Sequence, residues 1–246
     1  MSNPFHQRES LDRPIDVPQL TAEQILARVL HRDGLMLVID KPAGLPVHRG
    51  PKGGPNLEAS FDALRFGLPR PPVLAHRLDK DTSGCLVLGR HRKATASLGL
   101  LFKHGKISKT YWAVVEGGPL EDEGTIDMPL GRLNAERGWW QKVDPEGQQA
   151  VTNWKVMGRG EGLTWVALEP VTGRTHQLRV HSSAQGWPIF GDNIYGNGPR
   201  FGEPRLHLHS REIGIPISKN KEPVRVVAPA PEHMRERLRA CGWNGE

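Results

Sequence analysis

The sequence has few of the features that mark secreted, membrane or disulfide-stabilised proteins. Only two of its 246 residues are cysteines, and Cys85 and Cys241 lie far apart in the chain. Two cysteines cannot build a disulfide framework, so we expect free thiols and a reducing compartment. No apolar run approaches the length of about 18 residues that crosses a membrane, and the polar N-terminal stretch has no apolar signal core. We therefore expect a cytoplasmic protein that does not enter a membrane.

Motifs for nucleotide phosphates and for metal ions are also scarce. A predicted strand over residues 34–41 is followed by Pro42, Ala43 and Gly44, but these residues lack the Walker pattern of a phosphate-binding loop. His207 and His209 form a His-x-His pair that could bind a metal ion. No cluster of carboxylates or cysteines accompanies this pair. The sequence therefore argues against a phosphate-binding loop for nucleotides, and it supports a metal site at His207 and His209 only weakly.

Glycine and proline, in contrast, are abundant, with 28 and 21 residues. The mean hydropathy is -0.49. Frequent turn residues in a chain of moderate apolar content indicate a β-rich fold with much polar surface. The length allows one large domain with a substantial core.

The charge is positive and unevenly distributed. The net charge is +6 and the isoelectric point is about 9.5. Between Ser60 and Thr110 there are ten basic residues and only three acidic ones. Such a basic region favours a polyanionic partner, although a solvated helix face over residues 90–109 would also account for part of it.

The apolar pattern predicts more strands than helices. We expect strands over residues 34–41, 85–88, 109–117, 149–157, 163–170, 206–210 and 224–227. We expect helices over residues 91–104 and 231–239, a helix within 172–181 capped by Thr172 or Thr175, and a short helix starting at Thr21. The pattern indicates an α+β fold with a mostly antiparallel sheet. We divide the chain into an N-terminal arm with a short helix, residues 1–30, and a catalytic core, residues 31–246.

The stretch over residues 76–90 is the most informative one. A charged turn that contains Asp79, with Arg77 and Lys80 beside it, runs into the short apolar strand at residues 85–88. A carboxylate that is fixed at a strand end among cations stays ionised, which suits nucleophilic or electrostatic catalysis. The spacing alone fits equally well a turn whose aspartate caps the backbone and pairs with Arg77.

A family resemblance distinguishes these alternatives. Residues 76–84 read His-Arg-Leu-Asp-x-x-Thr-Ser-Gly, and residues 172–181 read Thr-Gly-Arg-x-His-Gln-x-Arg-x-His. Both resemble signatures of the RluA-type RNA pseudouridine synthases. Residues 41–48, 109–117 and 191–196 are similar to further motifs of that family and occur in the expected order. The resemblance covers roughly residues 31–228.

The resemblance implies specific roles for residues. Asp79 would be the nucleophile, Tyr111 would stack on the target base and assist a proton transfer, and Arg174, with Arg179 as the alternative, would pair with Asp79. We expect further contacts to RNA from six residues: Arg77, Lys41, His48, Lys80, His176 and Arg179. Relatives use no cofactor and no metal, so His207 and His209 would be structural or would face RNA.

The implied fold is a single catalytic domain with a bent, mixed, mostly antiparallel sheet, flanking helices and an RNA cleft, without the S4 domain of many relatives. The implied substrate is a loop uridine in ribosomal or transfer RNA, and we expect a monomer. Trp139 and Trp140 are adjacent, so in a strand one of them would face outward. That tryptophan could stack on a base, although packing at a sheet edge is the commoner role. Two other classes stay open: an RNA chaperone without activity, and a metal-dependent phosphoesterase that uses His207, His209 and Asp192.

Overall fold

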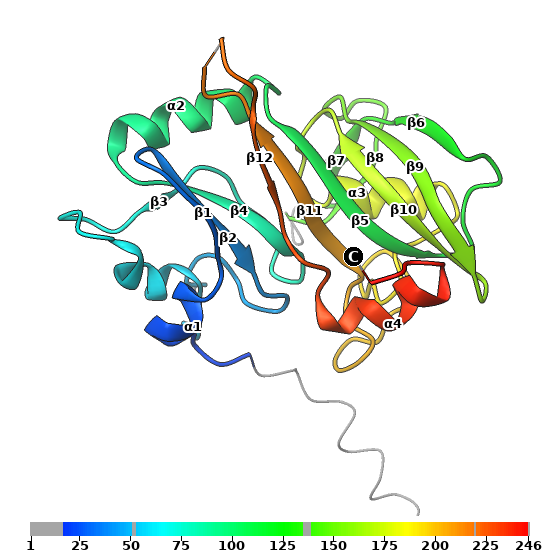
Figure 1. Ribbon diagram of the computed structural model, residues 1–246. Helices are drawn as coiled ribbons and strands as arrows, with labels where there is room; N and C mark the ends of the chain where they lie inside the picture. Colours follow the sequence, from blue (N-terminus) through cyan, green and yellow to red (C-terminus); the bar gives the residue numbers. More distant parts are fainter. Residues whose placement is uncertain (1–16, 51–52, 135–138, 219, 246) are drawn as a thin grey trace, which may run out of the picture.

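A large twisted sheet organises the chain in the computed structural model, which describes residues 17–50, 53–134, 139–218 and 220–245 (Figure 1). The ten strands that these residues contribute to it are β1 (Val29–Arg32), β2 (Met36–Lys41), β3 (Val73–Leu74), β4 (Ser83–Gly89), β5 (Ser108–Glu116), β6 (Glu123–Asp127), β9 (Val151–Gly160), β10 (Leu163–Pro170), β11 (Leu208–Ile215) and β12 (Val224–Val227). Strands β7 (Leu130–Arg132) and β8 (Gln141–Val143) form a separate hairpin. The helices are α1 (Ala22–Leu26), the 3-10 helix η2 (Glu58–Leu64), α2 (Arg92–Lys103), α3 (Gln177–Ala184) and α4 (Glu232–Ala240).

The order of strands along the sheet is β1-β2-β4-β11-β5-β10-β9-β6, with β3 added to β4 and β12 added to β11. The pair β4–β11 is parallel, and the other pairs of the sheet are antiparallel. This arrangement confirms the predicted α+β class with a mixed, mostly antiparallel sheet. The β4–β11 pair joins an N-terminal half of the sheet to a C-terminal half, since β5, β10, β9 and β6 lie beyond β11.

The close approach of β4 to β11 depends on Gly84. Its φ of +101° is in the left-handed region, and a Cβ at this position would lie 2.2 Å from the carbonyl oxygen of Ser210. A larger residue would therefore push the two strands apart. The neighbouring Ser83 Oγ is 2.8 Å from Nδ1 of His209, which ties the two halves together by their side chains.

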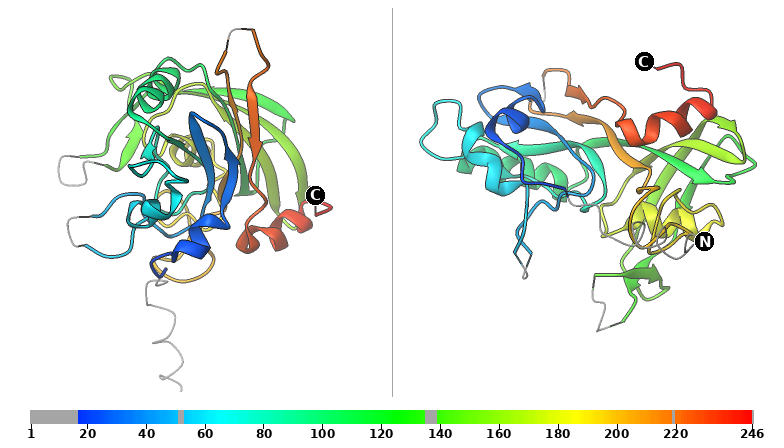
Figure 2. Two further views of the ribbon diagram at one scale, coloured as in Figure 1. Left: turned by 60° about the vertical axis from the view of Figure 1, so that its left-hand side comes forward. Right: turned by 90° about the horizontal axis from the view of Figure 1, so that it is seen from below.

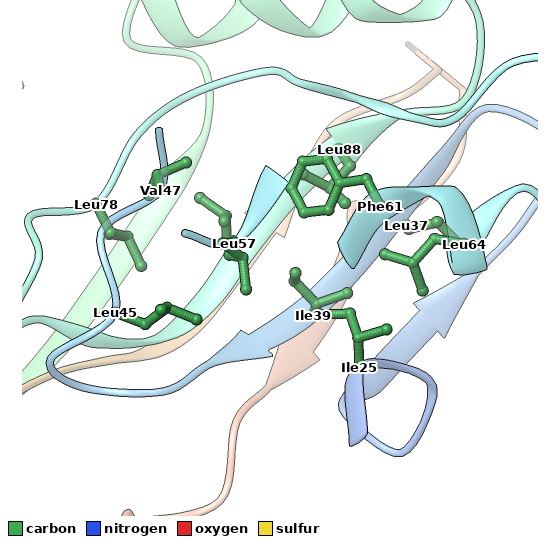
Figure 3. Packing of buried hydrophobic residues seen from close by; sticks show 11 residues of the cluster. Ile25, Leu37, Ile39, Leu45, Val47, Leu57, Phe61, Leu64, Leu78 and Leu88 are labelled. Carbon is green, nitrogen blue, oxygen red and sulfur yellow. The ribbon is translucent and has the colours of Figure 1, made fainter. Parts of the chain in front are cut away.

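Strands β2 and β4 are buried on both faces, as their continuous apolar sequences predict. Leu37, Ile39, Leu86 and Leu88 pack on one side against residues of α1 and η2 (Figure 3). The alternate residues of the same strands pack on the other side, against α2 and β12. Ile25 of α1 is fully buried in the first cluster, so this short helix is part of the core.

In the C-terminal half, side chains that alternate along β5 contact helices on opposite faces of the sheet. Ala113 and Val115 share a cluster with Leu178 of α3, whereas Val114 shares one with Met234 and Leu238 of α4. The right-hand view of Figure 2 shows α3 and the β7–β8 hairpin on one side of the sheet, and α4 on the other. The alternation along β5 therefore places α3 and α4 on opposite faces of the sheet.

The structure also departs from the sequence predictions. Strand β1 was not predicted, and it begins at Val29, before the expected start of the core. Helix α3 begins at Gln177, and neither Thr172 nor Thr175 caps it, because His176 at the N-cap has a left-handed backbone, with φ 53° and ψ 16°. The two cysteines are free and buried, as predicted. No helix among the described residues is long and apolar enough to cross a membrane.

Candidate active site

A cleft of about 550 Å³ lies where the two halves of the sheet meet. Its walls come from the loop before β4, from the start of β5, and from the loop and first turn of α3. Among the described residues that line it, Asp79 is the one carboxylate, and the cations are Arg77, Lys103, Lys109, Arg174 and Arg179. A single acid in a basic cleft matches the requirements of a reaction on a polyanion.

Asp79 lies on a turn that is held to the sheet from several directions. Its carbonyl oxygen accepts a hydrogen bond of 3.2 Å from Thr82 N. Its carboxylate is partly accessible, with 32% of the side chain exposed. A fixed backbone and an accessible carboxylate are what a nucleophile requires.

His76 anchors the start of the same loop. Its Nε2 accepts a hydrogen bond of 3.0 Å from Val87 N, and its ring stacks on Phe102 with 4.1 Å between centroids. Burial lowers the pKa of His76 to about 3. The imidazole is therefore neutral at physiological pH, as an acceptor at Nε2 must be. His76 has a structural role in holding the loop that carries Asp79.

Lys41 is fully buried, which does not fit the predicted contact with RNA. Its Nζ donates to three carbonyl oxygens, those of Lys80 at 2.8 Å, Thr82 at 2.8 Å and Pro42 at 3.0 Å. Burial lowers the pKa of Lys41 to about 7, against the opposing effect of nearby carboxylates. The last residue of β2 thus points inward and stabilises the turn that follows Asp79, because these carbonyls would otherwise be unsatisfied.

Arg179 enters the cleft from α3 and is paired with a buried acid. Its Nε and Nη2 donate to the two carboxylate oxygens of Asp192 at 2.8 and 2.7 Å, and both side chains are almost fully buried. Arg179 also lies near enough to Asp79 for the two charges to interact. A bidentate partner fixes the Arg179 guanidinium in the cleft wall.

Arg174 does not make the expected pair with Asp79. Its side chain is exposed, its Nε donates to the carbonyl of Gln149 at 3.0 Å, and within the described residues it forms no ion pair with Asp79. The cause is the loop before α3, where Gln177 Oε1 accepts from Arg174 N and from Thr172 Oγ1. These bonds hold residues 172–174 outside the helix, with Arg174 at the rim of the cleft.

Tyr111 lies on β5 in the cleft wall, as expected. Its side chain is hydrogen-bonded to Ser210 and packs against both core clusters that meet here. Burial raises the pKa of Tyr111 above its ordinary value. A phenol that is harder to deprotonate is poorly suited to act as a base, so the geometry favours packing against a substrate over proton abstraction.

Of the other residues predicted to contact RNA, Arg77 and His176 line the cleft, whereas Lys80 and His48 do not. Arg77 is exposed in the cleft wall, and His176 lies inside it with Nε2 3.8 Å from Asp79 Oδ2. Lys80 lines a different, smaller pocket. His48 is outside the cleft lining and pairs with Glu58, with 2.6 Å between Nδ1 and Oε2.

Trp139 is more exposed than edge packing predicts. It precedes β8, 57% of its surface is accessible, and its ring lies edge-on to His176 with 5.4 Å between centroids. The residue therefore presents a large aromatic surface next to His176, which lines the cleft. The sequence alone does not show that Trp139 lies beside His176.

A second, larger cavity of about 830 Å³ lies beside α4, where four acidic side chains are mixed with the basic ones. Its mixed charge makes it a poor match for a phosphate backbone. His207 and His209 are buried in the structure, and Asp192 is engaged by Arg179. Within the described ranges no group of three or more histidines, cysteines or carboxylates could hold a metal ion.

Comparisons with known proteins agree with this geometry. Residues 35–184, more than half of the chain, match the family described as RNA pseudouridylate synthase. A Zymomonas mobilis protein named as an uncharacterized RNA pseudouridine synthase is 43% identical over 207 residues, covering 83% of this chain and 94% of that protein. The ribosomal large subunit pseudouridine synthase C of Vibrio cholerae is 32% identical over 219 residues, covering 85% of this chain and 68% of that protein.

Solved structures have the same fold. The structure of human RNA pseudouridylate synthase domain containing 4 matches with a TM-score of 0.74 and 29% identity, covering 89% of this chain and 95% of that one. The similarity therefore extends over both halves of the sheet and over the cleft between them.

Proposed function

The chain belongs to the RluA-type RNA pseudouridine synthases, which are isomerases, and we propose that it converts a loop uridine of ribosomal or transfer RNA to pseudouridine with Asp79 as nucleophile. The observation that supports this assignment is the position of Asp79. It is the one carboxylate among the described lining residues of a basic cleft, accessible and faced by His176 and Arg179. We further propose that the protein works as a cytoplasmic monomer.

The proposed reaction is balanced within one nucleotide. The C1′–N1 glycosidic bond of the uridine breaks, the uracil turns, and a C1′–C5 bond forms. The proton on C5 leaves, and N1 gains one. Asp79 assists by attack on C1′ or on C6 of the ring, and no outside oxidant or reductant is required. An ionised, fixed carboxylate is suited to either attack.

We assign the orienting cation to Arg179 in place of Arg174. Its rigid pair with Asp192 leaves it in the wall near Asp79, whereas Arg174 lies at the exposed rim. A preorganised cation stabilises negative charge that develops near it during the reaction. Tyr111, which stays protonated, would pack against the target base.

RNA recognition would rely on charge and stacking. Arg77, Lys103 and Lys109 line the cleft and would meet phosphates. Chemistry at C1′ and C5 requires the target to leave its stack, and this costs least in a loop. Arg77, exposed beside Asp79, is placed to hold the strand once the uridine has turned outward.

Trp139→Ala is expected to weaken RNA binding by about 5- to 100-fold, the effect of losing one stacked base. The dissociation constant can be measured by filter binding, and Trp139→Phe, which keeps an aromatic ring, should bind nearly as well as the wild type. Leu120→Ala is the control, because Leu120 is an exposed apolar residue that does not line the cleft. Equal binding by Trp139→Ala and wild type would show that Trp139 does not contact RNA.

The function is tested by mapping pseudouridine in ribosomal and transfer RNA transcripts after incubation with the purified protein and a chelator. New pseudouridine at defined loop positions, absent when the RNA is incubated alone, is the expected result. Absence of product in both RNA classes, although the protein binds them, would contradict the proposed substrates and would favour an RNA chaperone.

A further inference from the structure

Two aromatic side chains connect Asp79 to the β7–β8 hairpin. His176 Nε2 is 3.8 Å from Asp79 Oδ2, and Nδ1 of the same ring is 2.7 Å from the hydroxyl oxygen of Tyr195. That hydroxyl accepts a hydrogen bond of 2.9 Å from Gln141 N, the first residue of β8. Tyr195 is itself held by Asp192, whose Oδ1 accepts from Tyr195 N at 3.0 Å. His176 therefore lies between Asp79 and Tyr195, and Tyr195 lies between His176 and Gln141.

The pattern of donors favours one tautomer of His176. The Tyr195 oxygen uses a lone pair to accept from Gln141 N, so its own proton is available to Nδ1 of His176. A neutral ring that accepts at Nδ1 carries its proton on Nε2, the atom that faces Asp79. The opposite tautomer would direct a lone pair at the carboxylate, which is repulsive. Burial lowers the pKa of His176, so the neutral ring is the relevant form.

The backbone of His176 shows that the surrounding structure imposes this position. Its φ of 53° lies in the left-handed region, which is uncommon for residues other than glycine, and only 8% of its surface is exposed. Such strain persists where packing and hydrogen bonds over-determine a conformation. At this position the strained backbone places the imidazole between Tyr195 and Asp79.

We propose that His176 is a positioning residue for the nucleophile, which donates from Nε2 to the Asp79 carboxylate while Tyr195 fixes its tautomer. This inference rests on the proposed function. The separation of 3.8 Å is longer than a hydrogen bond, and such contacts commonly shorten when the substrate closes the site. Because Gln141 N holds Tyr195, the alignment of Asp79 depends on how the β7–β8 hairpin is seated.

Two amide substitutions separate the roles of the two ring nitrogens. His176→Gln places an amide near the position of Nε2, so it keeps a donor for Asp79 and loses the bond to Tyr195. His176→Asn places an amide near Nδ1, so it keeps the bond to Tyr195 and loses the donor, and asparagine tolerates the left-handed backbone well.

In single-turnover and steady-state assays on an RNA that the wild type modifies, His176→Asn is expected to lower kcat by about 10- to 100-fold, the effect of one hydrogen bond to a charged group. KM should change little, and His176→Gln should keep most of the wild-type kcat. The reverse order of the two variants would overturn the proposal, because it would show that only the bond to Tyr195 matters. Equal activity of both variants with the wild type would also overturn it.

A second measurement does not depend on activity. Long-range ¹⁵N–¹H correlation spectra distinguish the two neutral tautomers of histidine, and the proton of His176 is expected on Nε2 in the wild type and to redistribute in Tyr195→Phe. A proton on Nδ1 in the wild type would overturn the inference even if the enzyme is active. Conversely, the Nε2 tautomer together with absence of any RNA product would leave the inference standing and would contradict the proposed substrate.

Discussion

Replacing Asp79 with asparagine is expected to reduce pseudouridine formation by at least about 10⁴-fold, because the amide cannot act as the nucleophile and the cleft offers no second carboxylate among the described lining residues. The substitution preserves the shape of the side chain. RNA affinity should therefore stay within about threefold of the wild type, since phosphate contacts supply most of it. The measurement is single-turnover kinetics on the modified RNA, together with a binding titration.

Asp81→Asn is the matched control for this experiment. Asp81 lies two residues further along the same turn, and it lines a different pocket together with Lys80. The same change in charge at Asp81 should leave turnover within about fivefold of the wild type, because Asp81 does not line the cleft and would not reach the reacting uridine. Full activity in Asp79→Asn, or an equal loss in both variants, would refute the assignment of Asp79 as nucleophile.

Arg179→Met is expected to lower the free energy of unfolding by about 3–5 kcal/mol, because it leaves the buried Asp192 carboxylate without its cation. For a chain of this size the melting temperature should fall by about 6–20 °C. Thermal unfolding followed by circular dichroism measures the change, and activity below the melting temperature should also be lost, since Asp79 loses the cation that faces it.

The double variant Arg179→Met with Asp192→Asn separates stability from catalysis. It removes both charges, so it should regain at least half of the lost melting temperature while turnover stays low. Recovery of turnover as well would show that Arg179 acts only on folding. A melting temperature of Arg179→Met within about 2 °C of the wild type would contradict the buried pair itself.

The same pair makes stability depend on acidity. Burial alone would raise the pKa of Asp192, but the Arg179 guanidinium outweighs burial and holds it below its usual value. A carboxylate with a lowered pKa in the folded state contributes stability that is complete above about pH 4 and is lost as the pH falls through the lowered pKa.

The strands of the core could be predicted from the sequence because their signal is local. The residues of β2 and β4 form continuous apolar runs, which indicate burial on both faces. The pairing of β9 with β10 follows equally from their alternation and from the short turn that joins them. Strand β1 was missed because three of its four residues are half-buried and the fourth, Arg32, is exposed. Its sequence, which includes a histidine and an arginine, shows neither a continuous apolar run nor an alternation.

The site was only partly predictable, because the partners of Asp79 depend on long-range packing. The motif around Asp79 predicts this residue as the nucleophile. Arg174 and Arg179 stand together in the second motif, residues 172–181, where the resemblance favoured Arg174 and the sequence does not rank their distances from Asp79. The ranking comes from the left-handed His176, which starts α3 late and leaves Arg174 outside. Lys41 was assigned to RNA because residues 41–48 resemble a family motif, and only the three-dimensional structure shows the carbonyls that Lys41 satisfies.

The parallel pairing of β4 with β11 also determines when activity can first arise during synthesis of the chain. Ser83, which follows the nucleophile turn, is 126 positions away from its partner His209. Asp79 would therefore leave the ribosome long before α3 and β11, which complete the opposite wall of the cleft. Contacts between such distant segments form late in folding, because closing a long loop is costly in entropy. An incomplete nascent chain would thus carry Asp79 without the side chains of α3 and β11 that surround it in the folded protein. Activity would begin only when the C-terminal half of the sheet has packed against the N-terminal half.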